Sequence, residues 1–163
     1  MKKITKFLIL VFTIFFFNYS SVFAAASTSS GSDSNDYDSL YKKGKNLVLR
    51  AKKLEKKNKK EKAKKLYLKA LGKFEKAYAK DKKNADILNY LGYTLRKTGE
   101  LEKAEIYYLK GLKIDAGHLG INEYLGELYV QTNRIDLAKK RLEVLNGCKC
   151  EEYEELKELI ENK

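Results

Sequence analysis

The sequence predicts an all-α fold, a short right-handed solenoid of about three helix-turn-helix units closed by a C-terminal capping helix. Two observations predict it. When the sequence is compared with itself at an offset of 34 residues, five identities fall within one 15-residue window. Within each segment, apolar residues recur at three- and four-residue spacing, which places them on one face of a helix. The 163 residues suffice for one such domain.

The first 24 residues have the features of an export signal. Three lysines precede an apolar run at 7–17, which is shorter than the roughly 20 residues that cross a bilayer. Small residues around Ala24 suit a signal peptidase, and Ala26 is a second cleavage point. We expect residues 1–24 to be a cleaved signal peptide of bacterial type, which makes the mature protein periplasmic or secreted. An uncleaved anchor is the alternative.

The next segment, residues 25–40, is rich in Ser and Asp and has little to bury. We therefore expect a flexible tether. The helical domain is expected over residues 41–163. Its units are expected at about 44–84, 85–118 and 119–150, with the capping helix at 151–161.

The second unit shows the helix-turn-helix pattern most clearly. Leu88, Leu91 and Leu95 share one helical face. Gly92 on the same face costs about 1 kcal/mol of helix propensity relative to Ala, which indicates close approach of a neighbouring backbone. Gly99 then suits a turn that needs positive φ. The same pattern recurs in the third unit, where the corresponding residues include Leu125, Gly126 and Asn133.

The first unit is longer than the others. Five of its residues precede their counterparts in the second unit by 41 positions, and they are Ala51, Asn58, Ala63, Tyr67 and Ala70. Because 41 exceeds 34 by one heptad, we expect its second helix to carry one extra heptad and to run from about Lys59 to Ala79.

The pattern resembles the tetratricopeptide repeat, whose signature places an aromatic residue, Leu-Gly, a second aromatic residue, Ala-x3-Phe and Pro over 34 residues. The resemblance covers roughly residues 41–146 and concerns the fold rather than the function. Departures are Asn122 in an aromatic position, Leu142 in place of Phe, and Ala116 in the position of the Pro. The matching elements are Leu91-Gly92, Leu125-Gly126, Ala104-x3-Tyr108 and Ala138-x3-Leu142. An irregular helical bundle is the alternative fold.

The resemblance implies a concave groove, lined by the first helix of each unit, that holds an extended peptide or a partner helix. Its side chains are expected on the face opposite Leu91 and Leu95. The selected groove residues are Lys45, Lys52, Asn89, Tyr93, Arg96, Lys97, Glu123, Glu127 and Gln131. The groove is then basic at one end and acidic at the other. In it, Asn89 and Arg96 are expected to hold backbone or carboxylate groups of a ligand, while Tyr93 offers an apolar face. Solvated positions without a ligand are the alternative.

Positive charge is concentrated in the first unit. Residues 41–83 hold 19 basic and 4 acidic side chains, whereas residues 84–163 hold 12 and 15. Attraction to anionic lipid or polysaccharide is one explanation, and a solvated Lys-rich surface is the other. No nucleic acid partner is expected, because the lysine runs lack the arginines and interleaved aromatic residues that base stacking favours.

Few residues are available for metal or nucleophile chemistry, since the chain has 1 His and 2 Cys. His118 is expected to be a surface residue in a turn. Cys148 and Cys150 are expected to pair in an oxidising compartment, and a bridge across one residue closes a small, readily reduced ring. Copper(I) binding and an intermolecular bridge are the alternatives.

These observations predict a non-enzymatic exported adaptor of the bacterial envelope that binds a protein or peptide in its groove. No cofactor is expected, and the oligomeric state is left open. The alternative is a peripheral envelope protein that binds anionic lipid or polysaccharide through the Lys-rich first hairpin. A thiol-redox or copper-handling role for Cys148 and Cys150 ranks third.

Overall fold

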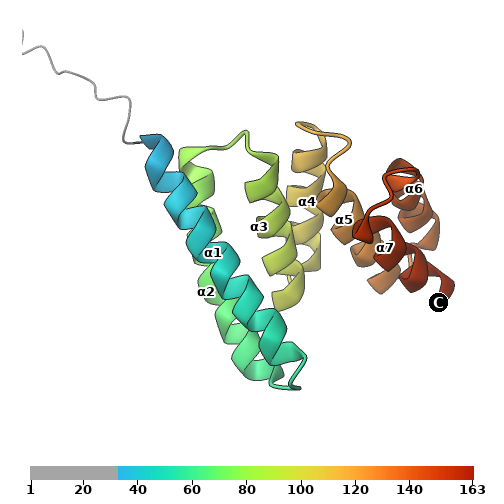
Figure 1. Ribbon diagram of the computed structural model, residues 1–163, viewed down its shortest axis with the longest axis horizontal. Helices are drawn as coiled ribbons and strands as arrows, with labels where there is room; N and C mark the ends of the chain where they lie inside the picture. The colour runs from blue at the N-terminus through green and yellow to red at the C-terminus, as the bar shows by residue number, and fades with distance from the viewer. Residues whose placement is uncertain (1–32) are drawn as a thin grey trace, which may run out of the picture.

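The computed structural model describes residues 33–163, and this part of the chain consists of seven α-helices without a strand (Figure 1). The expected signal peptide, residues 1–24, and residues 25–32 of the expected tether lie outside the described residues. The helices are α1 (Asp33–Glu55), α2 (Lys60–Lys80), α3 (Ala85–Thr98), α4 (Leu101–Leu112), α5 (Leu119–Gln131), α6 (Ile135–Leu145) and α7 (Glu151–Glu161).

The helices are arranged as successive hairpins. Helix α1 packs on α2, α3 on α4, and α5 on α6 (Figure 1). Helix α3 also contacts α2 of the first hairpin and α5 of the third. Helix α7 lies against α5 and α6, where the first helix of a further unit would pack. The predicted all-α solenoid with three helical hairpins and a closing helix is confirmed.

Helix α1 begins at Asp33, so the expected tether over 25–40 is wrong for its last eight residues. The apolar side chains of Tyr37, Leu40 and Tyr41 share one helical face and pack against the buried core of the first hairpin. The ring of Tyr41 lies edge-on to those of Phe74 and Tyr90. Burial of these rings offsets the entropy cost of ordering a segment rich in Ser and Asp.

The small residues at the hairpin contacts make room for large side chains. A Cβ atom at Gly92 would overlap the fully buried ring of Tyr108 in α4, and one at Gly126 would overlap Leu156 in α7. The expectation that a neighbouring backbone approaches Gly92 is therefore wrong, because the group that approaches is an aromatic ring. These two glycines set the distance of α3 from α4 and of α5 from α7.

The turns explain the different lengths of the hairpins. Gly99 (φ 101°), Asn58 (φ 56°) and Asn133 (φ 58°) adopt the left-handed conformation that ends a helix. As expected from the extra heptad, α2 has 21 residues against 12 in α4. The end of the first hairpin, where α1 meets α2, consequently projects beyond α3 and α4 (Figure 1).

Two further features concern the C-terminal part and the helices as a group. Cys148 and Cys150 are joined by a disulfide in the connection between α6 and α7. Among the described helices, none is both long and apolar enough to span a membrane.

Candidate partner-binding groove

Four tyrosines from the first helix of each hairpin form the centre of one face of the molecule, which we call the inner face. Tyr41 and Tyr90 lie edge to face with ring centroids 5.6 Å apart. Tyr93 and Tyr124 are tilted at 4.8 Å. These side chains come from α1, α3 and α5, so the inner face runs across the three hairpins. Burial raises the pKa of the Tyr93 hydroxyl above its ordinary range, and this ring is only 4% exposed.

Cations lie over these rings. The ammonium of Lys45 is 5.3 Å from the Tyr41 centroid, and that of Lys52 is 5.1 Å from the Tyr93 centroid. The Arg96 guanidinium lies 5.6 Å from the same Tyr93 ring. Such contacts are electrostatically favourable, and they strengthen as water is excluded. The inner face therefore alternates flat aromatic surface with positive charge.

Two of the predicted groove cations are already paired. Arg96 lies 2.6 Å from the Glu127 carboxylate, and Lys97 lies 2.8 Å from that of Glu55. Burial lowers the pKa of the Arg96 guanidinium, but Tyr108 and Glu127 raise it, and the net direction is upward. Arg96 thus joins α3 to α5 through this ion pair, and its expected contact with a ligand carboxylate stays a prediction.

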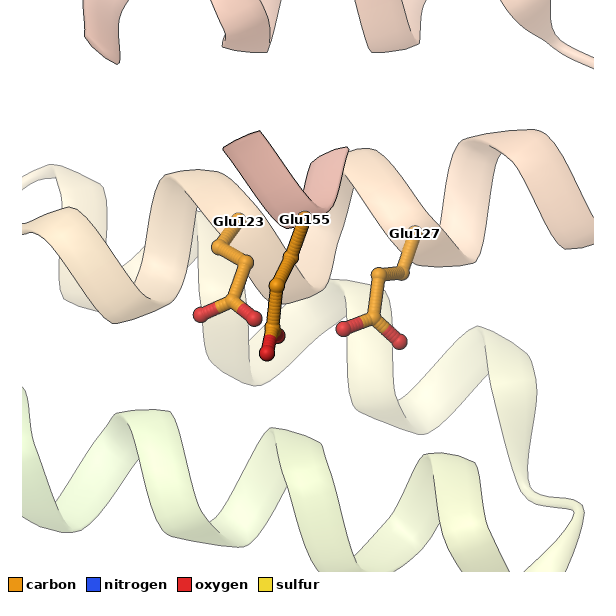
Figure 2. Close-up of side chains that lie close together, drawn as sticks. All are labelled: Glu123, Glu127 and Glu155. Carbon is orange, nitrogen blue, oxygen red and sulfur yellow. The ribbon is translucent and has the colours of Figure 1, made fainter. Parts of the chain in front are cut away.

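Carboxylates gather at the other end of the inner face. Glu123, Glu127 and Glu155 extend to the same side of their helices, and one oxygen of each lies within 4.8 Å of the others (Figure 2). Glu123 is only 4% exposed. Its burial, a hydrogen bond with Glu155 and the negative charges of Glu127, Glu155 and Glu152 raise its pKa to about 9. Glu123 therefore holds its proton at neutral pH.

This trio has the donor atoms of a cation site, but Arg96 already neutralises one member of it. The guanidinium lies 2.6 Å from Glu127. A metal ion bound by all three carboxylates would be repelled by that fixed charge. The geometry alone does not assign a metal here.

Two cavities open between the first helices and α7. The larger, of about 540 Å³, is lined by residues from α1, α3, α5 and α7 that include Lys45, Asn89, Tyr90, Glu123 and Glu152. The smaller, of about 140 Å³, is lined by Lys52, Glu123, Tyr124, Glu151, Glu152 and Glu155. Glu123, Tyr124 and Glu152 line both cavities, and we call these three residues the acidic wall.

The predicted groove residues thus fall into three groups. Those that line a cavity are Lys45, Lys52, Asn89 and Glu123. Those held by neighbouring side chains on the inner face are Tyr93, Arg96, Lys97 and Glu127. Gln131 is exposed at the end of α5 and lines neither cavity.

Residue Asn89 differs from the expectation because it is buried rather than open to solvent. It is 6% exposed, and its Oδ1 atom has no hydrogen-bond partner among the described residues. The side chain lies against Gly120 of α5, where a Cβ atom would come within 2.8 Å of the amide nitrogen. An acceptor is therefore held in the wall of the larger cavity without a donor.

Sequence reasoning missed several residues of this face, namely Tyr41, Tyr90, Tyr124, Glu152 and Glu155. A signal for two of them was present, because Tyr90 and Tyr124 are identical at the 34-residue offset. His118 lies in the connection before α5, as expected, but its side chain is largely buried rather than on the surface. Its Nδ1 accepts a hydrogen bond from the Ile121 amide as the cap of α5. Its Nε2 lies 3.4 Å from Asp86, and the side chain is 16% exposed.

Comparisons with known proteins support this architecture. The family model described as tetratricopeptide repeat matches residues 73–106. The second tetratricopeptide-repeat (TPR) domain of human RPAP3, solved with an HSP70 peptide, is similar with a TM-score of 0.55 and 18% identity over 78% of this chain and 99% of that chain. The chain has the tetratricopeptide-repeat fold.

Two further solved structures are similar to this chain. The TPR domain of Arabidopsis OM64 gives a TM-score of 0.55 at 13% identity, over 76% of this chain and 98% of that chain. The type III secretion translocator chaperone SycD of Yersinia enterocolitica gives 0.54 at 18% identity, over 79% and 83%. No curated protein matches the sequence. At these identities the likeness concerns the fold.

Proposed function

We propose that this TPR protein is a non-enzymatic adaptor that binds a segment of a protein partner along its inner face. The observation that carries the proposal is the pair of half-buried lysines, Lys45 and Lys52. They lie over tyrosine rings at the walls of the two cavities and form no ion pair with any of the described residues. Cations held on flat aromatic surface can recognise carboxylate and backbone oxygen atoms of an extended chain.

Two proteins of the same fold that bind peptides support a protein-binding role. The second TPR domain of human RPAP3 is in complex with an HSP70 peptide, and the first TPR domain of Spaghetti is bound to the HSP90 peptide SRMEEVD, with a TM-score of 0.52 to this chain. Both are complexes of a TPR domain with a peptide. By analogy, the partner of this chain presents an extended segment.

The proposed setting is the bacterial envelope, because residues 1–24 have the pattern of an export signal. Expression of the full chain in a bacterium, followed by cell fractionation and N-terminal sequencing, tests this setting. A periplasmic or secreted protein that begins at residue 25 or 27 supports it. An uncut chain in the cytoplasm contradicts it.

The experiment for the adaptor function is photo-crosslinking capture from an envelope extract, followed by mass spectrometry. The test variant is Lys45→Ala with Lys52→Ala. The matched control is Lys43→Ala with Lys53→Ala, which removes the same charge from exposed positions of the same helix. A protein captured by the wild type and the control but lost from the test variant supports the proposal. Equal capture by all three forms contradicts it.

A second candidate function is binding to an anionic lipid or polysaccharide surface. The observation that favours it is the projecting end of the first hairpin (Figure 1). The lysines there are all exposed, and they are Lys56, Lys57, Lys59, Lys60 and Lys62. Clustered lysines near an anionic surface contribute about 1 kcal/mol each, and salt screens the attraction.

Vesicle co-sedimentation separates the two candidates. A protein that uses the hairpin end binds phosphatidylglycerol vesicles at low salt and is released at high salt. Replacement of the five lysines by Gln abolishes this binding, whereas Lys45→Ala with Lys52→Ala leaves it intact. Equal binding to neutral phosphatidylcholine vesicles would contradict the second candidate.

A further inference from the structure

We propose that the acidic wall, Glu123, Tyr124 and Glu152, binds a cationic side chain of the partner, lysine or arginine. This inference rests on the proposed function and names the chemistry of one residue that the groove recognises. The partner segment would then present acceptor groups to Lys45 and Lys52 of α1 and a cation to α5 and α7.

The charged side chains that line the two cavities are mostly acidic. Six acidic side chains line them, against two lysines and one histidine. The acids come from different elements of the chain, and they are Asp86, Asp115, Glu123, Glu151, Glu152 and Glu155. Charges of one sign gathered in a concave site attract a ligand of the opposite sign, because the low-dielectric walls focus the field. With Glu123 protonated, the five other acids still outnumber the two lysines, and this excess selects a cation.

A residue that lines the larger cavity has a hydrogen-bond acceptor without a donor. Asn89 is only 6% exposed and lines the same cavity as Glu123. Its Oδ1 atom has no hydrogen-bond partner among the described residues. Leaving such an atom unsatisfied costs about 1 to 3 kcal/mol. A guanidinium or an ammonium group brings several N–H donors. Because this oxygen has less than 1 Å² of accessible surface, the Asn89 amide must rotate toward the cavity before such a group can satisfy it together with the carboxylates.

The acidic wall also contains an aromatic side chain, Tyr124, beside the carboxyl groups of Glu123 and Glu152. Tyr124 lines both cavities. The molecule's own cations already use this ring, since Lys52 lies 5.7 Å and Arg96 5.8 Å from its centroid. A flat ring flanked by carboxylates favours a cation with an apolar stem, because the stem packs on the ring while the charge meets the acids.

Negatively charged side chains crowd around Glu123. Its pKa is raised by burial first and then by Glu155, Glu127 and Glu152. Arg96 offsets the charge of Glu127, but among the described residues no ion pair involves Glu152 or Glu155, and Lys52 forms none either. A cation from the partner would stabilise the carboxylates, and Glu123 would release its proton when that cation binds.

The test uses a probe with the proposed chemistry alone, namely N-acetyl-arginine amide. Its control is N-acetyl-citrulline amide, which has nearly the same shape without the charge. Carbon-detected NMR of the glutamate side-chain carboxyls follows both titrations on the protein that comprises residues 25–163. We expect saturable shifts at Glu123 and Glu152 with the arginine probe and affinity on the order of tenfold lower for citrulline, because charge-assisted hydrogen bonds are about twice as strong as neutral ones.

Variants assign the shifts to the site. Glu123→Gln with Glu152→Gln should lose at least about tenfold in affinity for the arginine probe, since both carboxylate partners become neutral. Glu154→Gln with Glu158→Gln makes the same charge change at exposed positions of α7 and should leave the affinity within about twofold. Circular dichroism of each variant confirms that the helices remain.

Three results would overturn the inference. They are the absence of saturable shifts at Glu123 and Glu152, equal affinity for arginine and citrulline, or shifts produced by Ca²⁺ and not by the arginine probe. Because the probe is a single amino acid derivative, its failure leaves the capture experiment with Lys45 and Lys52 unaffected. Loss of capture with the probe still bound would instead contradict the adaptor function alone.

Discussion

At the scale of single residues, Glu123 connects the stability of the protein with pH. In the folded chain its pKa is raised to about 9 from an ordinary value of 4.5, mainly by burial. Between these two values the folded state holds a proton that the unfolded state has lost. Stability arising from this group therefore falls as pH rises from about 4.5 to about 9.

Replacement of Glu123 by Gln tests this linkage, because Gln is uncharged at every pH. We expect Glu123→Gln to gain about 1 to 3 kcal/mol relative to the wild type between about pH 5 and pH 8. Urea unfolding at both pH values measures the difference. Glu154→Gln, an exposed change on α7, should show no such gain. Parallel pH curves for Glu123→Gln and the wild type would contradict the raised pKa.

At the same scale, we expect alanine substitutions at two glycines inside helices to have opposite effects on stability. At Gly92 an added Cβ atom would overlap the buried ring of Tyr108, whereas at Gly72 nothing lies within 4 Å of the added atom. We expect Gly92→Ala to destabilise the fold by about 1 to 3 kcal/mol through overpacking. Gly72→Ala should stabilise it by about 0.5 to 1 kcal/mol through helix propensity. Thermal unfolding of both variants distinguishes these effects, and equal signs would refute the packing explanation.

At the scale of helices, α7 closes the solenoid through one buried side chain. Leu156 is fully buried against Gly126 of α5, while Leu159 on the same helix is 39% exposed. We expect Leu156→Ala to cost about 2 to 4 kcal/mol and Leu159→Ala less than about 1 kcal/mol. Equilibrium unfolding in guanidinium chloride measures both changes. A similar cost for the two variants would show that α7 does not close the core in this way.

The helices differ in how far the sequence predicted them. Internal repetition at 34 residues was enough for the fold class, because the repeated glycines admit large side chains of packed helices, Tyr108 of α4 at Gly92 and Leu156 of α7 at Gly126. The start of α1 was missed, since the helical spacing of Tyr37, Leu40 and Tyr41 lies within a segment of turn-forming composition.

The candidate site was predictable only in part. Lys45, Lys52, Asn89 and Glu123, which were chosen from the first helices, line the two cavities because they share a helical register with the repeat, whereas Gln131 lines neither. The acidic wall was missed, since it forms where α7 meets α5, and contacts between separate elements leave no periodic signal in one sequence. The same reason explains why the ion pair between Arg96 and Glu127 was not anticipated.

At the scale of the whole molecule, charge is distributed unevenly along the solenoid. The first hairpin and the loop after it, residues 41–83, hold 19 basic and 4 acidic side chains. Many of these cations are exposed on α1 and α2, which pack against each other over their whole length. Repulsion among them opposes folding of this hairpin, and salt screens that repulsion over a Debye length of about 10 Å at 0.1 M.

We therefore expect the midpoint of thermal unfolding to rise with sodium chloride between about 0.05 and 0.5 M, by a few degrees for a domain of this size. Replacement of Lys56, Lys57, Lys59, Lys60 and Lys62 by Gln should raise the midpoint at low salt and reduce its dependence on salt. A matched set of five Gln replacements at carboxylates of the C-terminal half, where acids slightly exceed bases, should not have this effect.

A midpoint that falls with salt in the wild type would mean that favourable ion pairs, such as that of Arg134 with Glu105, outweigh repulsion in the hairpin. The positive charge would then be neutral or favourable for folding. Retention of the lysines despite a measured cost to stability would instead favour their use in binding an anionic surface, because a residue that only destabilises is readily replaced.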